Sequence, residues 1–480
     1  MLLVVIPAEA SVELVMVVHR HGARTLLVKN ATSLAEGGAA LTAQGAGQLR
    51  EIGKTFRGRY LDPSTCGDDC LEDLPKGAYD GTRVRVISSG FDRTLASAAS
   101  FQQGAFPSTP ALPIPVYSTP PPDDWIIRAY ENCPAYLVKM NDWFKSEEFL
   151  AYQAKVAPLM AKLSTITSKN VTLINFWNTF DELNTQRDAV LLSSRLTLNE
   201  ALSEPVWPQV VETADWLEAG RYGRAVAGNL IGGTLLSEIL YRMRSRISNA
   251  QPAAQRLVEY SAHYPTIMAL LATLPFQKND TVFLSGIPSY GAMLAFELRK
   301  AGASGPYVVS LRAQDGAEAT YRTVPLPCAK GGDAAENEGG VGSCTYEDFQ
   351  ALAAPEAITA QGQWCTICNA TKMDACAGIK AQPALDNPAT YDFTLNKTSA
   401  ADAGGFVDLA KDAPQSAVTM GGGGGGDDAG KIAGAAVGSA LGAALLTAAV
   451  MGAWFSCRQP GWWRNSGSGG GSGNIQMAAA

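Results

Sequence analysis

The sequence predicts an α/β fold in which helices flank a mainly parallel sheet, with a smaller helical insertion domain and one C-terminal transmembrane helix. Three mostly apolar runs, at 15–18, 84–87 and 257–260, each lead into a loop and then into a helical pattern. This order is typical of parallel sheets whose two faces are covered by helices. The transmembrane helix is predicted from residues 432–455, an uncharged segment that is long enough to span a bilayer.

The first predicted strand, at 15–18, stops abruptly at a cluster of cations around Gly22. In open α/β sheets, the loops beyond the carboxyl ends of the strands hold ligands. We therefore expect Gly22 to let the backbone turn tightly beside a ligand. A helix is expected next, capped by Thr42 and running to Tyr60.

The second unit repeats this order. A strand at 84–87 runs into small residues and then Arg93, and residues 95–101 have the pattern of a helix. Arg93 is thus expected near a helix N-terminus, where anions are favoured. A proline-rich stretch at 105–122 leaves the α/β order, and residues 123–220 carry aromatic and leucine residues at helical spacings. We interpret 123–220 as a helical cap inserted over the sheet.

The third unit places His263 at the corner between a strand and a helix, where Pro265 suits the first helical turn. Because the chain has only three histidines, this position is informative. Residues 281–325 alternate in polarity and are expected to form edge strands. Residues 328–376 form a cysteine-rich end to this part of the chain.

Composition limits the partners and the compartment. The chain has 480 residues and a formal net charge of −7, which argues against nucleic acid as a partner. Eight of nine cysteines precede the apolar segment, and an even number indicates four disulfides in an oxidising compartment. Two cysteine pairs with short spacings also suit zinc, but no histidine lies near them, so no metal and no cofactor are expected. Five Asn-x-Ser/Thr sites fit glycosylation: Asn30, Asn170, Asn279, Asn369 and Asn396.

The expected domain boundaries follow from these patterns. They are 1–10 (the remnant of a signal peptide, or else an N-terminal strand), 11–122 and 221–380 (α/β core), 123–220 (helical cap), 381–430 (flexible stalk), 431–456 (transmembrane helix) and 457–480 (short cytoplasmic tail). Basic residues after the span predict a single-pass type I protein with its bulk luminal or extracellular, in an endolysosomal or plasma membrane. Gly434, Gly438 and Gly442 form a ridge that would allow a homodimer.

The cations at these strand ends point to phosphate chemistry. Five basic side chains meet if the three strands are neighbours: Arg20, His21, Arg24, Arg93 and His263. A single arginine or histidine at such a place is more often structural, so the interpretation rests on the cluster. Guanidinium groups match a tetrahedral dianion, and a histidine can attack phosphorus to form a phosphohistidine. The expected partner is therefore a phosphomonoester substrate.

Three segments resemble a known family. Arg20-His21-Gly22-Ala23-Arg24-Thr25 resembles the RHGxRxP signature of the histidine acid phosphatases, branch two of the histidine phosphatase superfamily, with Leu26 in place of the proline. Phe91-Asp92-Arg93-Thr94 resembles the family's D-R-T segment, and Tyr260-Ser261-Ala262-His263 resembles its Y-S-A-H-D segment. The likeness covers about residues 13–370. The layout of signal, luminal domain and C-terminal span is similar to that of the membrane-bound lysosomal-type members.

The resemblance implies a histidine phosphatase fold and an acid phosphatase that works through a phosphohistidine. It implies that His21 is the nucleophile, that His263 assists, and that phosphate is bound by Arg20, Arg24 and Arg93. It also implies two disulfides, Cys133–Cys368 and Cys328–Cys344. The pairing of the remaining four cysteines stays open: Cys66, Cys70, Cys365 and Cys376.

One position departs from the family pattern. The family's general acid is the aspartate after the second histidine, and here that position is Tyr264. Either the Tyr264 phenol or another carboxylate must then supply the proton. We expect an active phosphatase that cleaves aryl phosphates far better than alkyl phosphates. The alternative is a weakened pseudophosphatase that acts as a membrane-tethered binder of phosphorylated ligands and holds phosphate or vanadate without turnover.

Overall fold

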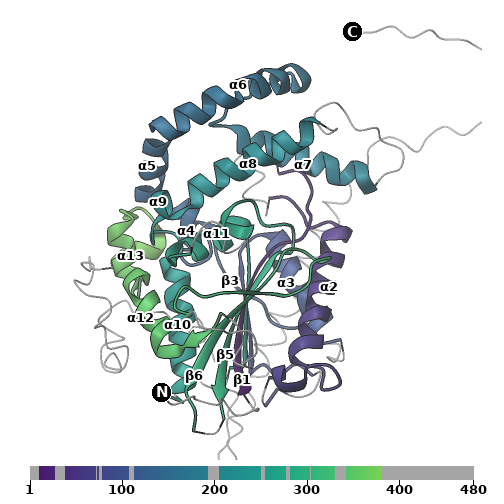
Figure 1. The fold of residues 1–480 in the computed structure, drawn as a ribbon, viewed down its shortest axis with the longest axis vertical. Coiled ribbons are helices and arrows are strands. Elements are labelled where there is room, and N and C mark those ends of the chain that lie inside the picture. Colours follow the sequence, from purple (N-terminus) through teal and green to yellow (C-terminus); the bar gives the residue numbers. More distant parts are fainter. Residues whose placement is uncertain are drawn as a thin grey trace, which may run out of the picture. The chain divides into compact units, whose positions relative to one another are not determined.

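One eight-stranded sheet organises the chain, in the order β3-β2-β4-β1-β5-β6-β7, with β8 beside β6 (Figure 1). The computed structural model describes residues 10–27, 38–71, 73–74, 78–107, 113–192, 205–249, 255–276, 282–302, 304–329 and 342–379. The strands are β1 (Ala10–Arg20), β2 (Val84–Ser89), β3 (Tyr117–Thr119), β4 (Leu257–Ala262), β5 (Met293–Ala301), β6 (Tyr307–Gln314), β7 (Arg322–Val324) and β8 (Cys344–Thr345).

Helices separate or follow these strands. They are α2 (Ala43–Tyr60), α3 (Asp92–Ala105), α4 (Ala129–Asn132), α5 (Pro134–Trp143), α6 (Glu147–Thr167), α7 (Phe176–Leu192), α8 (Val206–Tyr222), α9 (Arg224–Ala227), α10 (Gly233–Ile247), α11 (Tyr264–Thr273), α12 (Tyr346–Ala353) and α13 (Gln361–Ile367). The expected cap of α2 is confirmed, because the Thr42 side chain accepts a hydrogen bond from the Gly45 amide.

The sheet is mixed, so the prediction of a mainly parallel sheet is wrong for the part beyond β1. β1, β4, β2 and β3 pair in parallel. From β1 onward the pairing is antiparallel, through β5 and β6 to β7 and β8. Only a few residues join β5 to β6, and so short a connection permits an antiparallel pair alone. β5 also pairs with β1 and is no edge strand, and residues 282–284 form a 3₁₀ turn instead of a strand.

Two cores lie on the two faces of the sheet. Leu14, Met16 and Val18 of β1 pack into a cluster with α10, α11 and α12. Val15 and Val17 point to the other face and pack against α2 and α3. Figure 1 shows these helices on opposite sides of the strands. Since alternate side chains of a strand face opposite ways, a single apolar run serves both cores.

Helices α4 to α8 occupy the region where the sequence predicts a helical cap. Much of it has an apolar cluster of its own, with Phe149, Leu163, Phe176 and Leu217 fully or almost fully buried. A separate cap domain stays a prediction. Within the described residues, none of the helices combines the length and hydropathy needed to cross a bilayer. Most of the predicted signal remnant, and the stalk, transmembrane helix and tail, lie outside the described residues.

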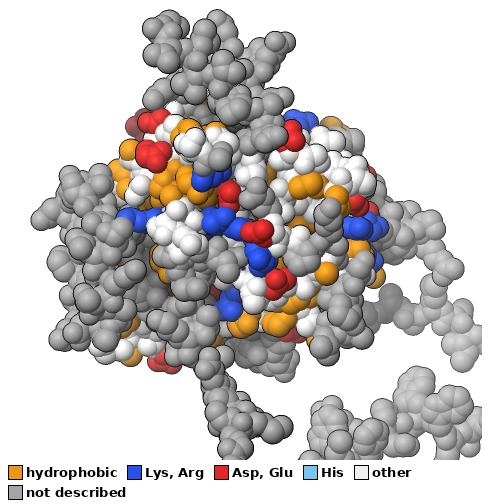
Figure 2. All heavy atoms as spheres, turned by 90° about the horizontal axis from the view of Figure 1, so that it is seen from below, with side chains coloured by type: hydrophobic (Ala, Val, Ile, Leu, Met, Phe, Trp, Pro, Cys, Tyr) orange, Lys and Arg blue, Asp and Glu red, His pale blue; other side chains and the backbone are white. Residues whose placement is uncertain are grey.

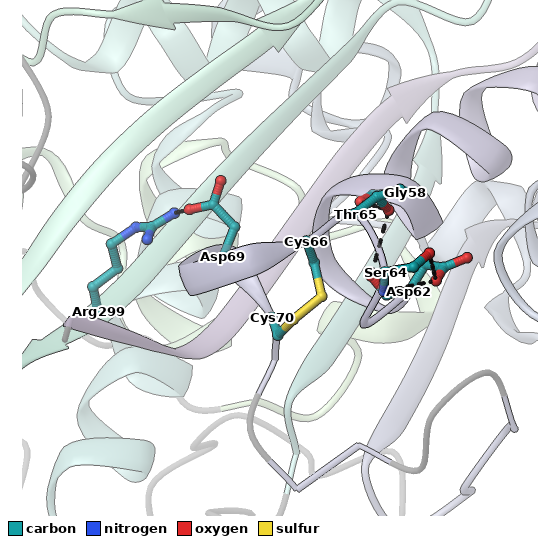
Figure 3. The surroundings of a disulfide bond; sticks show 8 residues. All are labelled: Gly58, Asp62, Ser64, Thr65, Cys66, Asp69, Cys70 and Arg299. Carbon is teal, nitrogen blue, oxygen red and sulfur yellow. Dashed lines mark hydrogen bonds and ion pairs between the residues drawn. A yellow bond between two sulfur atoms is a disulfide. The ribbon is translucent and has the colours of Figure 1, made fainter.

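Four disulfides are present among the described residues. Cys133–Cys368 and Cys328–Cys344 are confirmed, and the open pairings resolve as Cys66–Cys70 and Cys365–Cys376. Figure 3 shows Cys66–Cys70 closing the turn after α2, beside the ion pair between Asp69 and Arg299 of β5. Two of the predicted glycosylation sites, Asn170 and Asn369, are exposed. Their glycosylation stays a prediction.

The face drawn in Figure 2 carries basic and acidic side chains close together, with apolar side chains between them. Several ion pairs in the described residues join exposed or partly exposed side chains, such as Lys54 with Glu51 and Lys169 with Glu182. Such pairs contribute little to stability because water screens them.

Glu297 of β5 is a buried exception. It accepts hydrogen bonds from the Tyr60 hydroxyl at 2.6 Å and from Arg59 and Arg299 at 3.3 and 3.0 Å. Burial alone would raise the pKa of its carboxyl group. Arg299, Arg312 and Arg59 outweigh that effect and lower the pKa to about 2.

We expect Glu297→Gln to lower the free energy of unfolding by about 3–5 kcal/mol at pH 7, because it leaves buried arginines without their counter-charge. Urea denaturation at pH 7 measures this change. The contribution of Glu297 should persist down to about pH 4 and be lost as pH falls toward about 2. The exposed Glu51→Gln is the control, with an expected change below about 1 kcal/mol. Equal losses in both variants would contradict the assignment.

Candidate active site

The ends of β1 and β4 bring two of the predicted site residues together. Arg20 lies opposite Ala262 in the parallel ladder, so His21 and His263 follow at the same level. The His21 amide donates a hydrogen bond to the Ala262 carbonyl at 3.0 Å. The two imidazole rings meet edge to face, with 5.4 Å between their centroids.

Gly22 serves a different purpose from the one expected. A Cβ atom there would lie 2.3 Å from the carbonyl oxygen of Gly45 in α2, and one on Gly45 would lie 2.1 Å from the oxygen of Ala23. Gly22 is not among the residues with positive φ. Its role is therefore the close approach of the loop to the first turn of α2, rather than an unusual turn.

Three arginines surround the histidines, from the end of β1 (Arg20), the following loop (Arg24) and the first turn of α3 (Arg93). All three are buried, with 5–8% exposure. Arg20 donates to the Pro288 carbonyl and stacks on the Tyr290 ring, 4.0 Å from its centroid. Each arginine keeps a buried Nε without a hydrogen-bond partner among the described residues, and Arg93 also keeps Nη1.

These unpartnered donors define what the site can bind. A buried donor without a partner costs free energy, and a multi-oxygen anion offers several acceptors at once. Burial and the charge of Arg24 lower the pKa of Arg93 to about 10, so the guanidinium stays charged near neutral pH. Burial likewise lowers the pKa of Arg20. The arrangement thus suits a compact anion of high charge.

His21 has the protonation state of a nucleophile. Its Nδ1 lies 2.8 Å from the Gly22 carbonyl oxygen, which can only accept, so Nδ1 carries the hydrogen and Nε2 the lone pair. Burial, with the charges of Arg93, Arg20 and Arg24, holds the pKa of the imidazole well below its ordinary value. The ring therefore stays neutral in mildly acidic solution.

A chain of hydroxyl groups orients His263. The Thr94 hydroxyl donates to the Ser89 and Phe91 carbonyls, so it accepts from the Ser89 hydroxyl at 3.0 Å. The Ser89 oxygen then accepts from Nε2–H of His263 at 2.8 Å. Because Nε2 of His263 is bound to Ser89, Nδ1 is the ring nitrogen that can contact a bound ligand. Burial and the charges of Arg93 and Arg128 hold the pKa of His263 well below its usual value.

Tyr264 is held by the helical region. Its hydroxyl donates to Glu218 Oε2 of α8 at 2.6 Å, and Glu218 Oε1 pairs with Arg221 at 2.6 Å. Burial and Glu218 raise the pKa of the phenol well above its ordinary value. The ring still borders the site, because the Arg20 guanidinium lies 5.1 Å from its centroid.

Two residues that sequence reasoning missed also reach the cluster. Arg128, just before α4, lies 4.5 Å from the centroid of the Phe91 ring, and Arg93 lies 4.6 Å from the same centroid. Asp181 of α7 pairs with Arg24 through Nη2 at 2.5 Å. Neither belongs to a motif, and each lies far along the chain from its partner, so the sequence carried no signal for them.

Comparison with known proteins agrees with this geometry. Residues 28–311 match the model of a protein family, the Histidine phosphatase superfamily (branch 2). The matched range begins just after the segment Arg20–Thr25. The testicular acid phosphatase of Homo sapiens is 27% identical over 406 residues, which cover 76% of this chain and 85% of that protein. The lysosomal acid phosphatase of Homo sapiens is 26% identical over 306 residues, covering 58% and 67%.

The fold is also similar to a solved structure. The phytase of Klebsiella sp. ASR1 superposes with a TM-score of 0.52 at 16% identity, over 73% of this chain and 98% of that one. At this identity the likeness supports the fold alone.

We expect the imidazole of His21 to stay neutral between pH 7 and 5, where an ordinary histidine takes up a proton. NMR of ¹³C-histidine-labelled protein measures this, since the chain has only three histidines. Arg93→Gln removes the strongest neighbouring charge, so the pKa of His21 should rise while burial keeps it below about 6.5.

The exposed Arg50→Gln is the matched control and should leave the titration unchanged. A wild-type His21 signal that titrates with a midpoint near 6.5 would rule out the electrostatic assignment.

Proposed function

This chain belongs to branch 2 of the histidine phosphatase superfamily, and we propose that it is an acid phosphatase that hydrolyses phosphate monoesters through a phosphohistidine at His21. The observation that carries the proposal is a neutral imidazole, with its lone pair on Nε2, beside three buried arginines. The named acid phosphatase relatives support a phosphatase enzyme.

Binding comes first in this mechanism. The phosphoryl oxygens accept hydrogen bonds from Arg20, Arg24 and Arg93, whose buried Nε atoms, together with Nη1 of Arg93, lack partners among the described residues. These cations then face the charge that develops on the equatorial oxygens during transfer. His263 adds a hydrogen bond from Nδ1 once a bound dianion favours the protonated ring, because Ser89 holds Nε2 on the other side.

Attack follows from His21. Its Nε2 lone pair forms a bond to phosphorus while the bond to the leaving oxygen breaks. The Gly22 carbonyl accepts from Nδ1–H and so stabilises the positive charge that the ring acquires. Water then attacks phosphorus, the P–N bond breaks, and phosphate is released. A nucleophile whose pKa lies well below that of an ordinary histidine supports operation at a pH below neutral.

The pseudophosphatase remains the second candidate because of one contact. The hydroxyl of Tyr264, at the position of the family's general acid, is bound to Glu218. Loss of a general acid typically costs about 10²–10⁴ in rate. This candidate predicts that phosphate or vanadate binds, with neither turnover nor a covalent intermediate.

We also propose that the catalytic part lies on the luminal or extracellular side of a membrane, anchored by the 431–456 span. Four disulfides support an oxidising compartment. The lysosomal acid phosphatase relative supports the same placement. A homodimer through the glycine ridge is part of the proposal.

Quenching into alkaline denaturant after mixing with a ³²P-labelled aryl phosphomonoester tests the intermediate, because the P–N bond of a phosphohistidine is stable in alkali and labile in acid. We expect label on the wild-type protein and none on His21→Ala, with turnover reduced by at least about 10³-fold in the variant. His19→Ala is no suitable control because His19 is buried against Glu259. Arg50→Gln serves instead and should keep its label. Phosphate binding without label or turnover in the wild type would favour the pseudophosphatase.

A further inference from the structure

We propose that Asp181 of α7 is the general acid and base of this site, in place of the carboxylate that position 264 lacks. The inference rests on the proposed phosphatase function and names a further catalytic residue for it. It starts from the geometry of Tyr264, whose hydroxyl hydrogen is given to Glu218. A phenol that donates to a buried carboxylate has no proton to spare for a leaving group.

Glu218 cannot substitute for the missing acid. Its side chain is fully buried, and its two oxygens are held by Arg221 and by Tyr264. Asp124 is held through Oδ1 alone, which accepts from the amides of Ile126 and Ile127, and its Oδ2 is buried without a hydrogen-bond partner among the described residues. Glu259 lies in the core against His19. Glu218, Asp124 and Glu259 are each at most 3% exposed, so a substrate that enters from solvent does not reach their oxygens.

Asp181 is placed differently. Its Oδ1 lies 2.5 Å from Nη2 of Arg24, and its side chain keeps 19% exposure, so solvent and substrate can reach it. It also interacts electrostatically with Arg20 and Arg93. The carboxylate thus already lies at the mouth of the site, on a donor that we assign to phosphate.

The direction of approach is right for a leaving group. Displacement at phosphorus places the nucleophile and the leaving oxygen on opposite sides. His21 attacks from the edge of the sheet, so the leaving oxygen points away from the strands. Figure 1 shows α7 and α8 beyond that edge, and Asp181 comes from α7.

The proton balance closes with Asp181 alone. A phosphoryl oxygen that binds Arg24 displaces the carboxylate, which then takes up a proton from solvent. As the Nε2–P bond forms and the P–O bond breaks, the Asp181 proton moves to the departing oxygen, which leaves as an alcohol. In the second step, Asp181 takes a proton from the water that attacks phosphorus as the P–Nε2 bond breaks.

The test compares glycerol 2-phosphate, whose leaving group needs a proton, with 4-nitrophenyl phosphate, whose leaving group does not. The wild-type enzyme should cleave both with kcat/KM values within roughly tenfold, contrary to the preference for aryl phosphates expected from Tyr264. Asp181→Asn should lose about 10²–10⁴-fold on glycerol 2-phosphate and less than about tenfold on 4-nitrophenyl phosphate. Asp181→Glu should recover part of the loss.

Two variants sharpen this comparison. Glu182→Gln changes the adjacent carboxylate of α7, which pairs with Lys169. It should leave kcat/KM unchanged for both substrates. Tyr264→Phe should change kcat/KM by the same factor for both substrates. A selective loss on glycerol 2-phosphate in Tyr264→Phe would assign the acid to the phenol and overturn the proposal.

Other outcomes are equally decisive. Equal losses of kcat/KM for both substrates in Asp181→Asn would show that Asp181 only positions Arg24. A gain in activity would show that Asp181 blocks the phosphate-binding site. Alkaline-quench labelling of Asp181→Asn with the aryl substrate separates this proposal from the proposed function. If the variant is labelled but shows no selective loss on glycerol 2-phosphate, only the role of Asp181 is refuted. An unlabelled wild-type protein would refute the phosphohistidine mechanism. Thermal unfolding of each variant with inorganic phosphate confirms that it is folded and binds.

Discussion

The parallel pairing of β1 with β4 is the constraint on which the site depends. Because both strands end at the same edge and in register, the residues that follow them, His21 and His263, must face each other. β2, on the other side of β4, brings Ser89 and the first turn of α3 to the same edge. The close contact of Gly22 with Gly45 holds the residues just after β1 against the first turn of α2.

Two buried clusters of arginines differ in whether a carboxylate balances their charge. Around Glu297, three guanidinium groups share one carboxylate, and the pKa of that carboxyl falls to about 2. At the sheet edge, Arg20 and Arg93 form no ion pair with a carboxylate among the described residues, and burial lowers their pKa values instead. The first cluster stabilises the fold. The second keeps donors unsatisfied, which costs stability and prepares the site for an anion.

The helical region does more than cover this edge. Through Glu218 and Arg221 it holds Tyr264, and through Asp181 it reaches Arg24. In the proposed mechanism, the strand ends and the first turn of α3 supply the nucleophile and the cations, while α7 and α8 supply the carboxylates in contact with Arg24 and Tyr264. If Asp181 is the general acid as proposed, the chemistry of the leaving group depends on α7 and α8, which lie apart from the strand ends that carry His21 and Arg20.

Local patterns in the sequence determined the strands that end in cations, the cap at Thr42, the helix that begins after His263 and the set of five basic residues. They did so because apolar periodicity and helix caps depend on neighbours along the chain. The antiparallel half of the sheet, the bond of Tyr264 to Glu218, and the approach of Asp181 and Arg128 were decided by tertiary structure. Arg24 and Asp181 are 157 residues apart, and only the packing of α7 over the sheet edge brings them together.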